Sequence, residues 1–176
     1  MKRIILITGG QRSGKSLYAE QLALNLSDQP VYLATAHVWD EEFRQRVAHH
    51  QSRRGPQWTN IDEEKHLSRH QLAGRVVVID CITLWCTNFF FRPDKAEWEQ
   101  PTVDEALSEL KDEFDRFTNQ DATFIFVTNE IGSGGVSDNA IQRRFTDLEG
   151  WMNQYVARQA DEVILMVSGI PVKIKS

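Results

Sequence analysis

The sequence has few cysteines, no long apolar run and no excess of basic charge. Its two cysteines, Cys81 and Cys86, have no second Cys or His pair at metal-binding spacing, which favours reduced structural thiols over a disulfide framework or a zinc site. No apolar run reaches the roughly 20 residues that a membrane-spanning helix needs, so we expect no membrane span. The net charge of −5 argues against general nucleic-acid binding, and we expect no nucleic-acid partner.

A signal-peptide pattern is also missing. The apolar stretch IILIT near Met1 is short and runs directly into a glycine-rich loop. We therefore expect a cytoplasmic protein.

The 176 residues instead alternate short apolar runs with helical patterns. Apolar runs at 3–8, 31–36, 76–80, 122–128 and 161–167 predict strands, and the segments 15–26, 40–54, 102–117 and 137–160 have helical patterns. This alternation predicts an α/β fold of the P-loop NTPase type, with a mostly parallel sheet and helices on both faces. The end of the chain predicts an antiparallel hairpin around Ser168 and Gly169. We expect one domain over residues 1–176, because no linker or repeat interrupts the pattern.

The stretch GGQRSGKS, residues 9–16, predicts a phosphate-binding loop. Gly9, Gly14, Lys15 and Ser16 meet the pattern G-x-x-x-x-G-K-[ST] between a predicted strand and a predicted helix. Glycines let successive backbone N–H groups face phosphate oxygens, and the start of the helix adds positive charge. Lys15 is expected to contact the β- and γ-phosphates, and Ser16 to bind Mg²⁺. An ordinary glycine-rich turn is the alternative.

Asp80 ends the apolar run VVVID and is the predicted second ligand of Mg²⁺. A helix cap or a turn is its alternative role. The sequence has no N-K-x-D motif, so it does not match a regulatory GTPase that reads guanine through that motif.

Residues 44–54, RQRVAHHQSRR, are basic and hold a histidine pair. Helical spacing from Phe43 and Val47 places His50 on the apolar stripe and His49 about 100° away. A histidine can act as a phosphoryl or nucleotidyl nucleophile when cations offset the phosphate charge. The candidate cations are Arg46, Arg53 and Arg54. A solvated basic surface is the alternative interpretation.

Seven stretches together carry a family resemblance. They are GGQRSGKS, YLATA, RVAHHQSRR, IDCITLWCTN, VTNEIGSGGV, RRFTDLEGWMNQ and ADEVILMVSGIPVKIK. In this order the chain resembles the bifunctional adenosylcobinamide kinase / adenosylcobinamide-phosphate guanylyltransferase family of cobalamin biosynthesis, over nearly its whole length.

The resemblance implies two reactions. The first phosphorylates the aminopropanol hydroxyl of adenosylcobinamide from a nucleoside triphosphate, and the second transfers GMP from GTP to give adenosylcobinamide-GDP and pyrophosphate. It also implies a GMP-histidine intermediate at His50, Mg²⁺ as cofactor, GTP and ATP as substrates, and a homotrimer. A kinase with one activity and a non-catalytic nucleotide-binding regulator are the alternatives.

The resemblance also implies which residues bind the nucleotide. The implied contacts are Gly9, Gly10, Gln11, Arg12, Ser13, Gly14, Lys15, Ser16, Ala34, Thr35, Ala36, Gln51, Ser52, Arg53, Arg54, Asp62 and Asp80. Asp62 and Asp80 are departures, since glutamate also occurs there in the family.

Two further groups of residues carry open alternatives. Glu130, in a glycine-rich loop at a predicted strand end, is a candidate base for the substrate hydroxyl or an indirect metal partner. The aromatic residues Trp85, Phe89, Phe90, Phe91 and Trp98 are expected to pack in the core or between subunits rather than to line a corrinoid surface.

Overall fold

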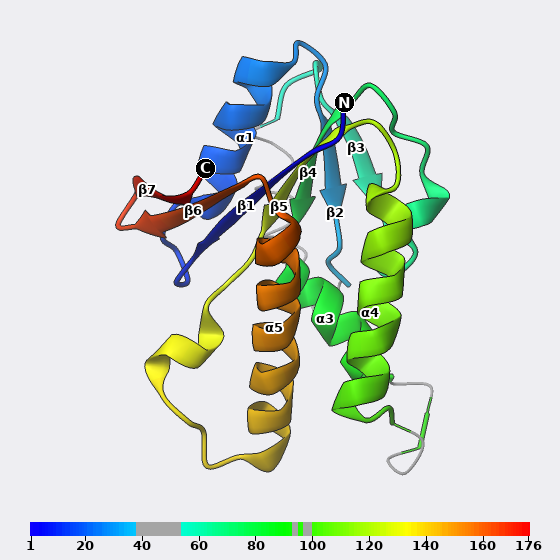
Figure 1. Ribbon diagram of the computed structural model, residues 1–176, viewed down its shortest axis with the longest axis vertical. Coiled ribbons are helices and arrows are strands. Elements are labelled where there is room, and N and C mark those ends of the chain that lie inside the picture. Colours follow the sequence, from blue (N-terminus) through cyan, green and yellow to red (C-terminus); the bar gives the residue numbers. More distant parts are fainter. Residues whose placement is uncertain (38–53, 93–94, 97–99) are drawn as a thin grey trace.

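The computed structural model describes residues 1–37, 54–92, 95–96 and 100–176, and these residues fold around a seven-stranded sheet (Figure 1). The strands are β1 (Arg3–Gly9), β2 (Val31–Ala34), β3 (Thr59–Asp62), β4 (Val76–Asp80), β5 (Thr123–Val127), β6 (Glu162–Val167) and β7 (Ile170–Lys175). Their order in the sheet is β3-β2-β4-β5-β1-β6-β7. Among the described residues, neighbouring strands are parallel except β6 and β7, which are antiparallel. This confirms the predicted mostly parallel sheet and its antiparallel hairpin.

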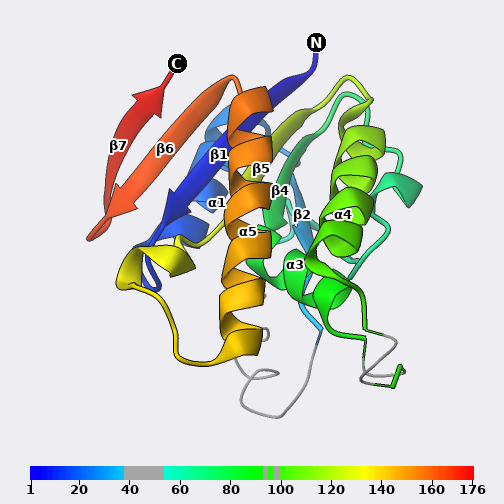
Figure 2. The ribbon, with the colours of Figure 1, turned by 60° about the horizontal axis from the view of Figure 1, so that its bottom comes forward.

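Helices cover both faces of this sheet, as predicted (Figures 1 and 2). The helices are α1 (Lys15–Leu26), α3 (Ile82–Phe90), α4 (Val103–Thr118) and α5 (Ala140–Gln159), with 3₁₀ turns η1 (Leu67–Arg69) and η3 (Ile131–Gly134). Successive β1 side chains point to opposite faces. Ile5 and Ile7 join the core that includes Ala19 and Ala23 of α1, whereas Ile4 and Leu6 join the larger core beneath α3, α4 and α5. Burial on both sides explains the nearly continuous apolar strands.

Helix α4 begins where local sequence chemistry predicts a start. The Thr102 side chain accepts a hydrogen bond from the Glu105 backbone N–H, and the Glu105 carboxylate accepts one from the Thr102 backbone N–H. This reciprocal pair satisfies two donors that the first turn leaves without helical partners. The apolar stripe of the helix, which includes Leu110 and Phe114, is buried against the sheet.

The aromatic residues of α3 belong to the core of the chain. Trp85, Phe89 and Phe90 are buried, and the Phe90 ring lies 5.9 Å from the Phe145 ring of α5. Phe91 is 38% exposed, and Trp98 lies outside the described residues. Core packing is therefore confirmed for these three aromatic residues of α3. A position of Phe90 between subunits is wrong, because residues of the same chain, including Phe145, already bury its ring.

The turn between β6 and β7 uses two residues with positive φ, Ser168 at 50° and Gly169 at 82°. Such turns match the twist of a two-stranded hairpin. The Gly169 N–H donates a 2.9 Å hydrogen bond to the carbonyl of Ser13. The hairpin turn therefore supports the glycine loop that follows β1.

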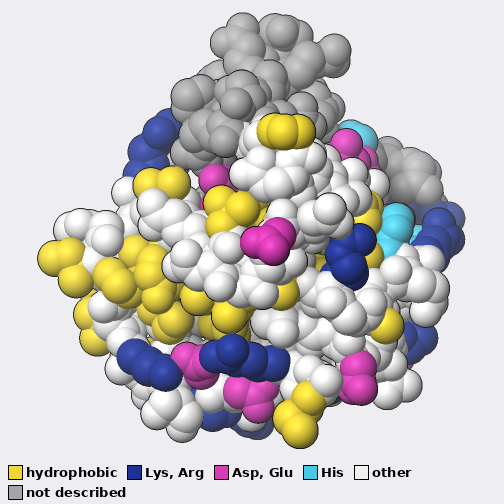
Figure 3. Space-filling model, turned by 90° about the horizontal axis from the view of Figure 1, so that it is seen from above, with side chains coloured by type: hydrophobic (Ala, Val, Ile, Leu, Met, Phe, Trp, Pro, Cys, Tyr) yellow, Lys and Arg dark blue, Asp and Glu magenta, His cyan; other side chains and the backbone are white. Residues whose placement is uncertain are grey.

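Strand β7 lies at one end of the sheet and is exposed along its length. Four apolar side chains of the hairpin are 44% to 65% exposed: Val167, Ile170, Val172 and Ile174. Figure 3 shows hydrophobic side chains gathered on the left, the side on which Figure 1 places β6 and β7. An exposed apolar edge strand is a surface suited to association.

Sequence patterns did not predict two elements. Strand β3 is a short exposed edge strand of mixed polarity, and α3 is apolar on most of its surface, so neither has a clear period. Both cysteines are free and buried, in agreement with structural thiols. Among the helices that the structure describes, none combines the length and the apolar character that crossing a membrane requires.

Candidate functional site

The glycine loop between β1 and α1 has the backbone conformation that a phosphate cradle requires. Gly9 has a φ of 150°, and a Cβ at this position would lie 2.6 Å from the carbonyl oxygen of Met166. Gly14, with a φ of 93°, precedes the first residue of α1. Both positions therefore require glycine, and the loop places the N-terminus of a helix beside the cradle.

Lys15 lies inside this loop. Its side chain is buried, and its ammonium donates to the Gly10 carbonyl at 2.5 Å and to Ser13 Oγ at 3.4 Å. Burial lowers the pKa of Lys15, while nearby acids, including Asp80 and Glu149, act in the opposite direction. The lysine is thus held over the cradle, where a phosphate oxygen would replace the Gly10 carbonyl as its partner.

The tip of the loop is open to solvent. Gly10, Gln11 and Arg12 are exposed, and Arg12 has a φ of 55°. The structure thus brings together, in one loop, the eight sequence-predicted nucleotide contacts from Gly9 to Ser16.

Ser16 and Asp80 meet across the sheet edge. The Ser16 hydroxyl donates a 2.6 Å hydrogen bond to Asp80 Oδ2, and the Tyr32 hydroxyl donates to the same oxygen at 2.7 Å. Hydroxyl and carboxylate oxygens are ligands that Mg²⁺ prefers. Within the described part of the chain, no group of three or more His, Cys, Asp and Glu side chains forms a metal site. The donor set therefore fits Mg²⁺ held by one or two protein oxygens with phosphate and water, rather than a protein cage.

The other predicted contacts near this edge differ in accessibility. Ala34 pairs in register with Asp62 on one side and Asp80 on the other, and Asp62 is exposed. Thr35 is fully buried, and its hydroxyl donates to the Cys81 carbonyl and accepts from the Cys81 N–H, both at 2.8 Å. Ala36 is half-buried. The Thr35 side chain therefore fixes the backbone next to Asp80.

The Arg54 side chain is also enclosed. It is 3% exposed, its guanidinium carbon lies 3.6 Å from the centre of the Tyr32 ring, and its Nη1 lies 3.7 Å from a Glu20 carboxylate oxygen. Its Nε donates to Asn60 at 2.8 Å. A nucleotide contact at Arg54 stays a prediction, and in this structure the guanidinium packs against the tyrosine that bonds Asp80.

A second polar cluster adjoins the phosphate loop on the α5 side of the sheet. The Thr8 hydroxyl donates to Glu130 at 2.9 Å, and the Glu130 N–H donates to the Gly9 carbonyl at 3.3 Å. Glu149 of α5 is 1% exposed and accepts a 2.6 Å hydrogen bond from the Thr83 hydroxyl. The sequence singled out Glu130 but missed Glu149 and Thr83.

Burial raises the pKa of Glu149 to about 7, and the negative charge of Glu130 acts in the same direction. One local signal marks this acid, because Glu149 lies between Phe145 and Met152 at helical spacing, within the buried stripe of α5. A carboxyl group in such a stripe indicates a functional or structural polar contact.

Several predicted residues lie outside the described residues. They are His49, His50, Gln51, Ser52, Arg53 and Arg46. Their predicted roles therefore stay predictions.

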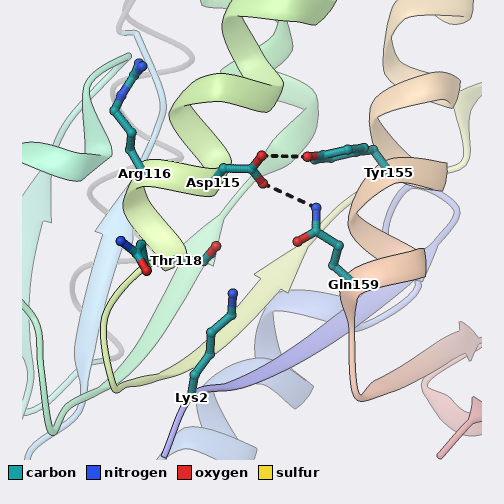
Figure 4. Close-up of a pocket in the computed structure, with 7 residues that line it drawn as sticks. Lys2, Asp115, Arg116, Thr118, Tyr155 and Gln159 are labelled. Carbon is teal, nitrogen blue, oxygen red and sulfur yellow. Dashed lines mark hydrogen bonds between the residues drawn. The ribbon is translucent and has the colours of Figure 1, made fainter.

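A pocket of about 670 Å³ lies at the opposite end of the sheet, between the end of α4 and the end of α5. Figure 4 shows Tyr155 and Gln159 pointing at Asp115, to which they donate at 2.7 and 3.3 Å. Because the phosphate loop is at the carboxyl ends of the strands, this pocket is separate from the site described above.

The sequence is similar to proteins of cobalamin biosynthesis. The model of the family "Cobinamide kinase / cobinamide phosphate guanyltransferase" matches residues 5–174. The chain is 37% identical to the bifunctional adenosylcobalamin biosynthesis protein CobU of Escherichia coli K12, covering 98% of this chain and 99% of that protein. It is 35% identical to the bifunctional protein CobP of Pseudomonas aeruginosa, covering 97% and 96%.

Solved structures with a similar fold include an ATPase of a bacterial type III secretion system, with a TM-score of 0.52 at 12% identity, covering 94% of this chain and 51% of that chain. A protein from Pyrococcus horikoshii, studied as PH0250, gives a TM-score of 0.52 at 8% identity, covering 99% and 86%. At these identities the likeness concerns the fold alone, which is that of P-loop NTPases.

Proposed function

The chain belongs to the cobinamide kinase / cobinamide phosphate guanyltransferase family, and we propose that its two reactions use one phosphate loop together with a histidine nucleophile. It is a transferase of adenosylcobalamin biosynthesis with kinase and guanylyltransferase activity. In the proposed sequence, the enzyme first phosphorylates the aminopropanol hydroxyl of adenosylcobinamide. It then transfers GMP from GTP to the new phosphate, and pyrophosphate leaves.

The observation that carries this proposal is the contact between the phosphate loop and the acid Asp80. Lys15 lies over the cradle, and Ser16 and Asp80 place two oxygens 2.6 Å apart at its edge. Lys15 offsets negative charge on the transferring phosphoryl group, and Ser16 and Asp80 hold Mg²⁺. When bound, Mg²⁺ neutralises charge on the phosphates.

His50 is the proposed nucleophile of the second reaction. A neutral ring nitrogen attacks the α-phosphorus of GTP, a P–N bond forms, and the bond to the pyrophosphate oxygen breaks with its electron pair leaving on pyrophosphate. The phosphate of adenosylcobinamide phosphate then takes the GMP group and frees the histidine. Lys15, which serves the kinase step, is not required as a nucleophile here.

Covalent labelling tests this proposal. Incubation with GTP labelled at the α-phosphate should make the protein heavier by one GMP, and the label should survive alkali and be lost in mild acid, as expected for a phosphoramidate. His50→Asn should lose the label and keep kinase activity. Label that persists in His50→Asn would exclude this nucleophile.

Two variants complete the test. His49→Asn should keep the label, because His49 lies on another side of the predicted helix. Lys15→Ala should reduce kinase turnover about a hundredfold or more. Near wild-type kinase turnover in Lys15→Ala would show that this loop does not serve phosphoryl transfer.

We also propose that the protein is a homotrimer that buries the exposed apolar face of the β6–β7 hairpin. Ile170 and Val172 are two residues apart on β7 and therefore share one face of an edge strand. Ile174, also exposed, follows them at an irregularity in the pairing of β7 with β6. A second copy of the chain is the expected occupant, because the face is apolar and strand edges pair readily. Ile170→Asp with Ile174→Asp should shift the mass in light scattering toward the monomer, whereas Val136→Asp, on an exposed loop residue, should not.

A further inference from the structure

The topology of the sheet places the end of β5 between the phosphate loop and the acid Asp80. Strand β5 lies between β1, which leads into the loop, and β4, which ends at Asp80. Val127, the last residue of β5, pairs with Ile7 on one side and with Asp80 on the other. The residues that directly follow β5 therefore emerge between the lysine that contacts the transferring phosphate and the proposed metal ligand.

Glu130 is the acid in this position that a substrate can reach. It is exposed, and it contacts the base of the phosphate loop through the Thr8 hydroxyl and through its own backbone N–H to Gly9. Two other acids nearby are occupied or enclosed. Asp80 accepts hydrogen bonds from two hydroxyl groups on one oxygen, and Glu149 is 1% exposed.

The backbone on both sides of Glu130 is fixed by α3 and α5. The Thr83 hydroxyl accepts hydrogen bonds from both the backbone and the side-chain nitrogen of Asn129, at 3.2 and 3.0 Å. Glu149 accepts from that same Thr83 hydroxyl and from the backbone N–H of Ile131. A catalytic group needs such support, because its position must be held closely for reaction.

Space for a large substrate opens in the loop that follows Glu130. A pocket of about 570 Å³ is lined by glycines of this loop, including Gly132 and Gly135, and by Arg143 and Arg144 of α5. Gly132 follows Glu130 by two positions, so the pocket and the acid belong to the same loop. Glu130 thus contacts the base of the phosphate loop at one side, and the loop that it begins lines a pocket at the other.

We propose that Glu130 accepts the proton of the substrate hydroxyl in the kinase reaction, an inference that rests on the proposed function. The hydroxyl oxygen forms a bond to the γ-phosphorus of the nucleoside triphosphate. The bond between that phosphorus and the bridging oxygen breaks, and its electron pair leaves on the nucleoside diphosphate. The hydroxyl proton moves to the Glu130 carboxylate. General base catalysis of this kind contributes about 10²- to 10⁴-fold.

The second reaction provides an internal control within the same protein. There the acceptor is a phosphate oxygen that already carries negative charge, so no proton has to be removed. Loss of the base at Glu130 should therefore slow the kinase reaction and leave guanylyl transfer unchanged. A purely structural role in the phosphate loop would slow both reactions.

The experiment compares Glu130→Gln with Thr8→Val. Glu130→Gln should lower kinase kcat with cobinamide at least a hundredfold, while GMP labelling and transfer to pre-phosphorylated cobinamide stay within about threefold of wild type. Thr8→Val removes only the hydrogen bond that holds the carboxylate and should lower kinase kcat less than tenfold. Glu130→Asp keeps a carboxylate and should recover part of the activity.

Three outcomes would overturn the inference: kinase activity retained in Glu130→Gln, both reactions lost together, or equal losses in Thr8→Val and Glu130→Gln. A wild-type protein that labels with GMP but does not phosphorylate cobinamide would instead contradict the proposed function. The two failures are therefore distinguishable.

Discussion

The hydroxyl of Ser16 and the carboxylate of Asp80 are joined by a 2.6 Å hydrogen bond, although 64 positions separate them in the sequence. The sheet produces this contact, because β4 ends at Asp80 on the edge where the phosphate loop leads into α1. Tyr32 donates to the same carboxylate oxygen, and Arg54 packs on the Tyr32 ring. The acid is therefore oriented before any nucleotide binds.

Asp80→Asn should reduce kinase kcat about a hundredfold and raise the Mg²⁺ concentration that half-maximal activity requires, since an amide lacks the negative charge of the proposed ligand. Tyr32→Phe is the matched control, because it keeps the ring under Arg54 and removes one hydrogen bond of about 1 kcal/mol, equivalent to less than tenfold in rate. Steady-state assays across Mg²⁺ concentrations measure both. Equal effects of the two substitutions would assign Asp80 a structural role.

The stability of the protein should depend on pH through Glu149. Besides burial, the groups that act on the pKa of its carboxyl include the Thr83 hydroxyl of α3, Glu130 and the Ile131 N–H after β5, and Lys15 of α1. The buried thiols of Cys81 and Cys86 also interact with this acid. The pKa of Glu149 is raised from 4.5 to about 7. The folded state therefore favours the neutral Glu149 carboxyl. This contribution to the free energy of unfolding is fully present below pH 4.5 and is lost as the pH rises through about 7, and the total decrease is about 3 kcal/mol.

Urea unfolding at pH 5 and pH 8 measures this effect. Glu149→Gln should flatten the decline of the unfolding free energy between the two pH values, because a neutral amide replaces the group that titrates. Glu109→Gln is the control, since the Glu109 side chain is 50% exposed and pairs with Arg92 at the surface. A decline that is equal in wild type and Glu149→Gln would show that other groups cause it.

The sequence predicts the phosphate loop of this site but not the contact between Glu149 and Thr83. The loop is local, so the spacing of Gly9, Gly14 and Lys15 predicts its conformation. Glu149 meets Thr83 across 66 positions and two helices, and no local pattern specifies that contact. Only the position of Glu149 in an apolar stripe indicated that it would be buried.

The same distinction applies to the fold. The buried strands and the capped helix α4 have patterns that dictate their structure, and the sequence predicted them. Strand β3 and helix α3 depend on neighbours instead: Ile61 of β3 pairs with Leu33 of β2, and Trp85 of α3 is fully enclosed by the core. Their structure follows from tertiary packing, which overrides weak local preference.

Phe90→Asp should unfold the chain rather than dissociate an assembly. Its ring is 8% exposed and contacts Phe91 and Phe145, so the substitution removes core packing and buries an unpaired charge, at a cost of about 4 kcal/mol or more. Phe91→Asp, at a 38% exposed position, should cost much less. Urea unfolding measures both, and a folded Phe90→Asp monomer would contradict the core assignment.

Gly14→Ala should weaken both the fold and nucleotide binding, because Gly14 has a φ of 93° and an added Cβ would lie 3.3 Å from the Cα of Gly169 in the hairpin turn. Strain of about 1–2 kcal/mol should lower the melting temperature by a few degrees. Gly74→Ala is a matched control, since Gly74 also has a positive φ, of 76°, but nothing lies within 4 Å of its added Cβ.

Without nucleotide, both Gly14→Ala and Gly74→Ala should have a lower melting temperature than wild type. Added nucleotide should then raise the melting temperature of Gly74→Ala as it does for wild type and that of Gly14→Ala much less, because bound ligand stabilises only a competent loop. Equal nucleotide-induced shifts in the two variants would show that the contact between the loop and the hairpin turn has no part in binding.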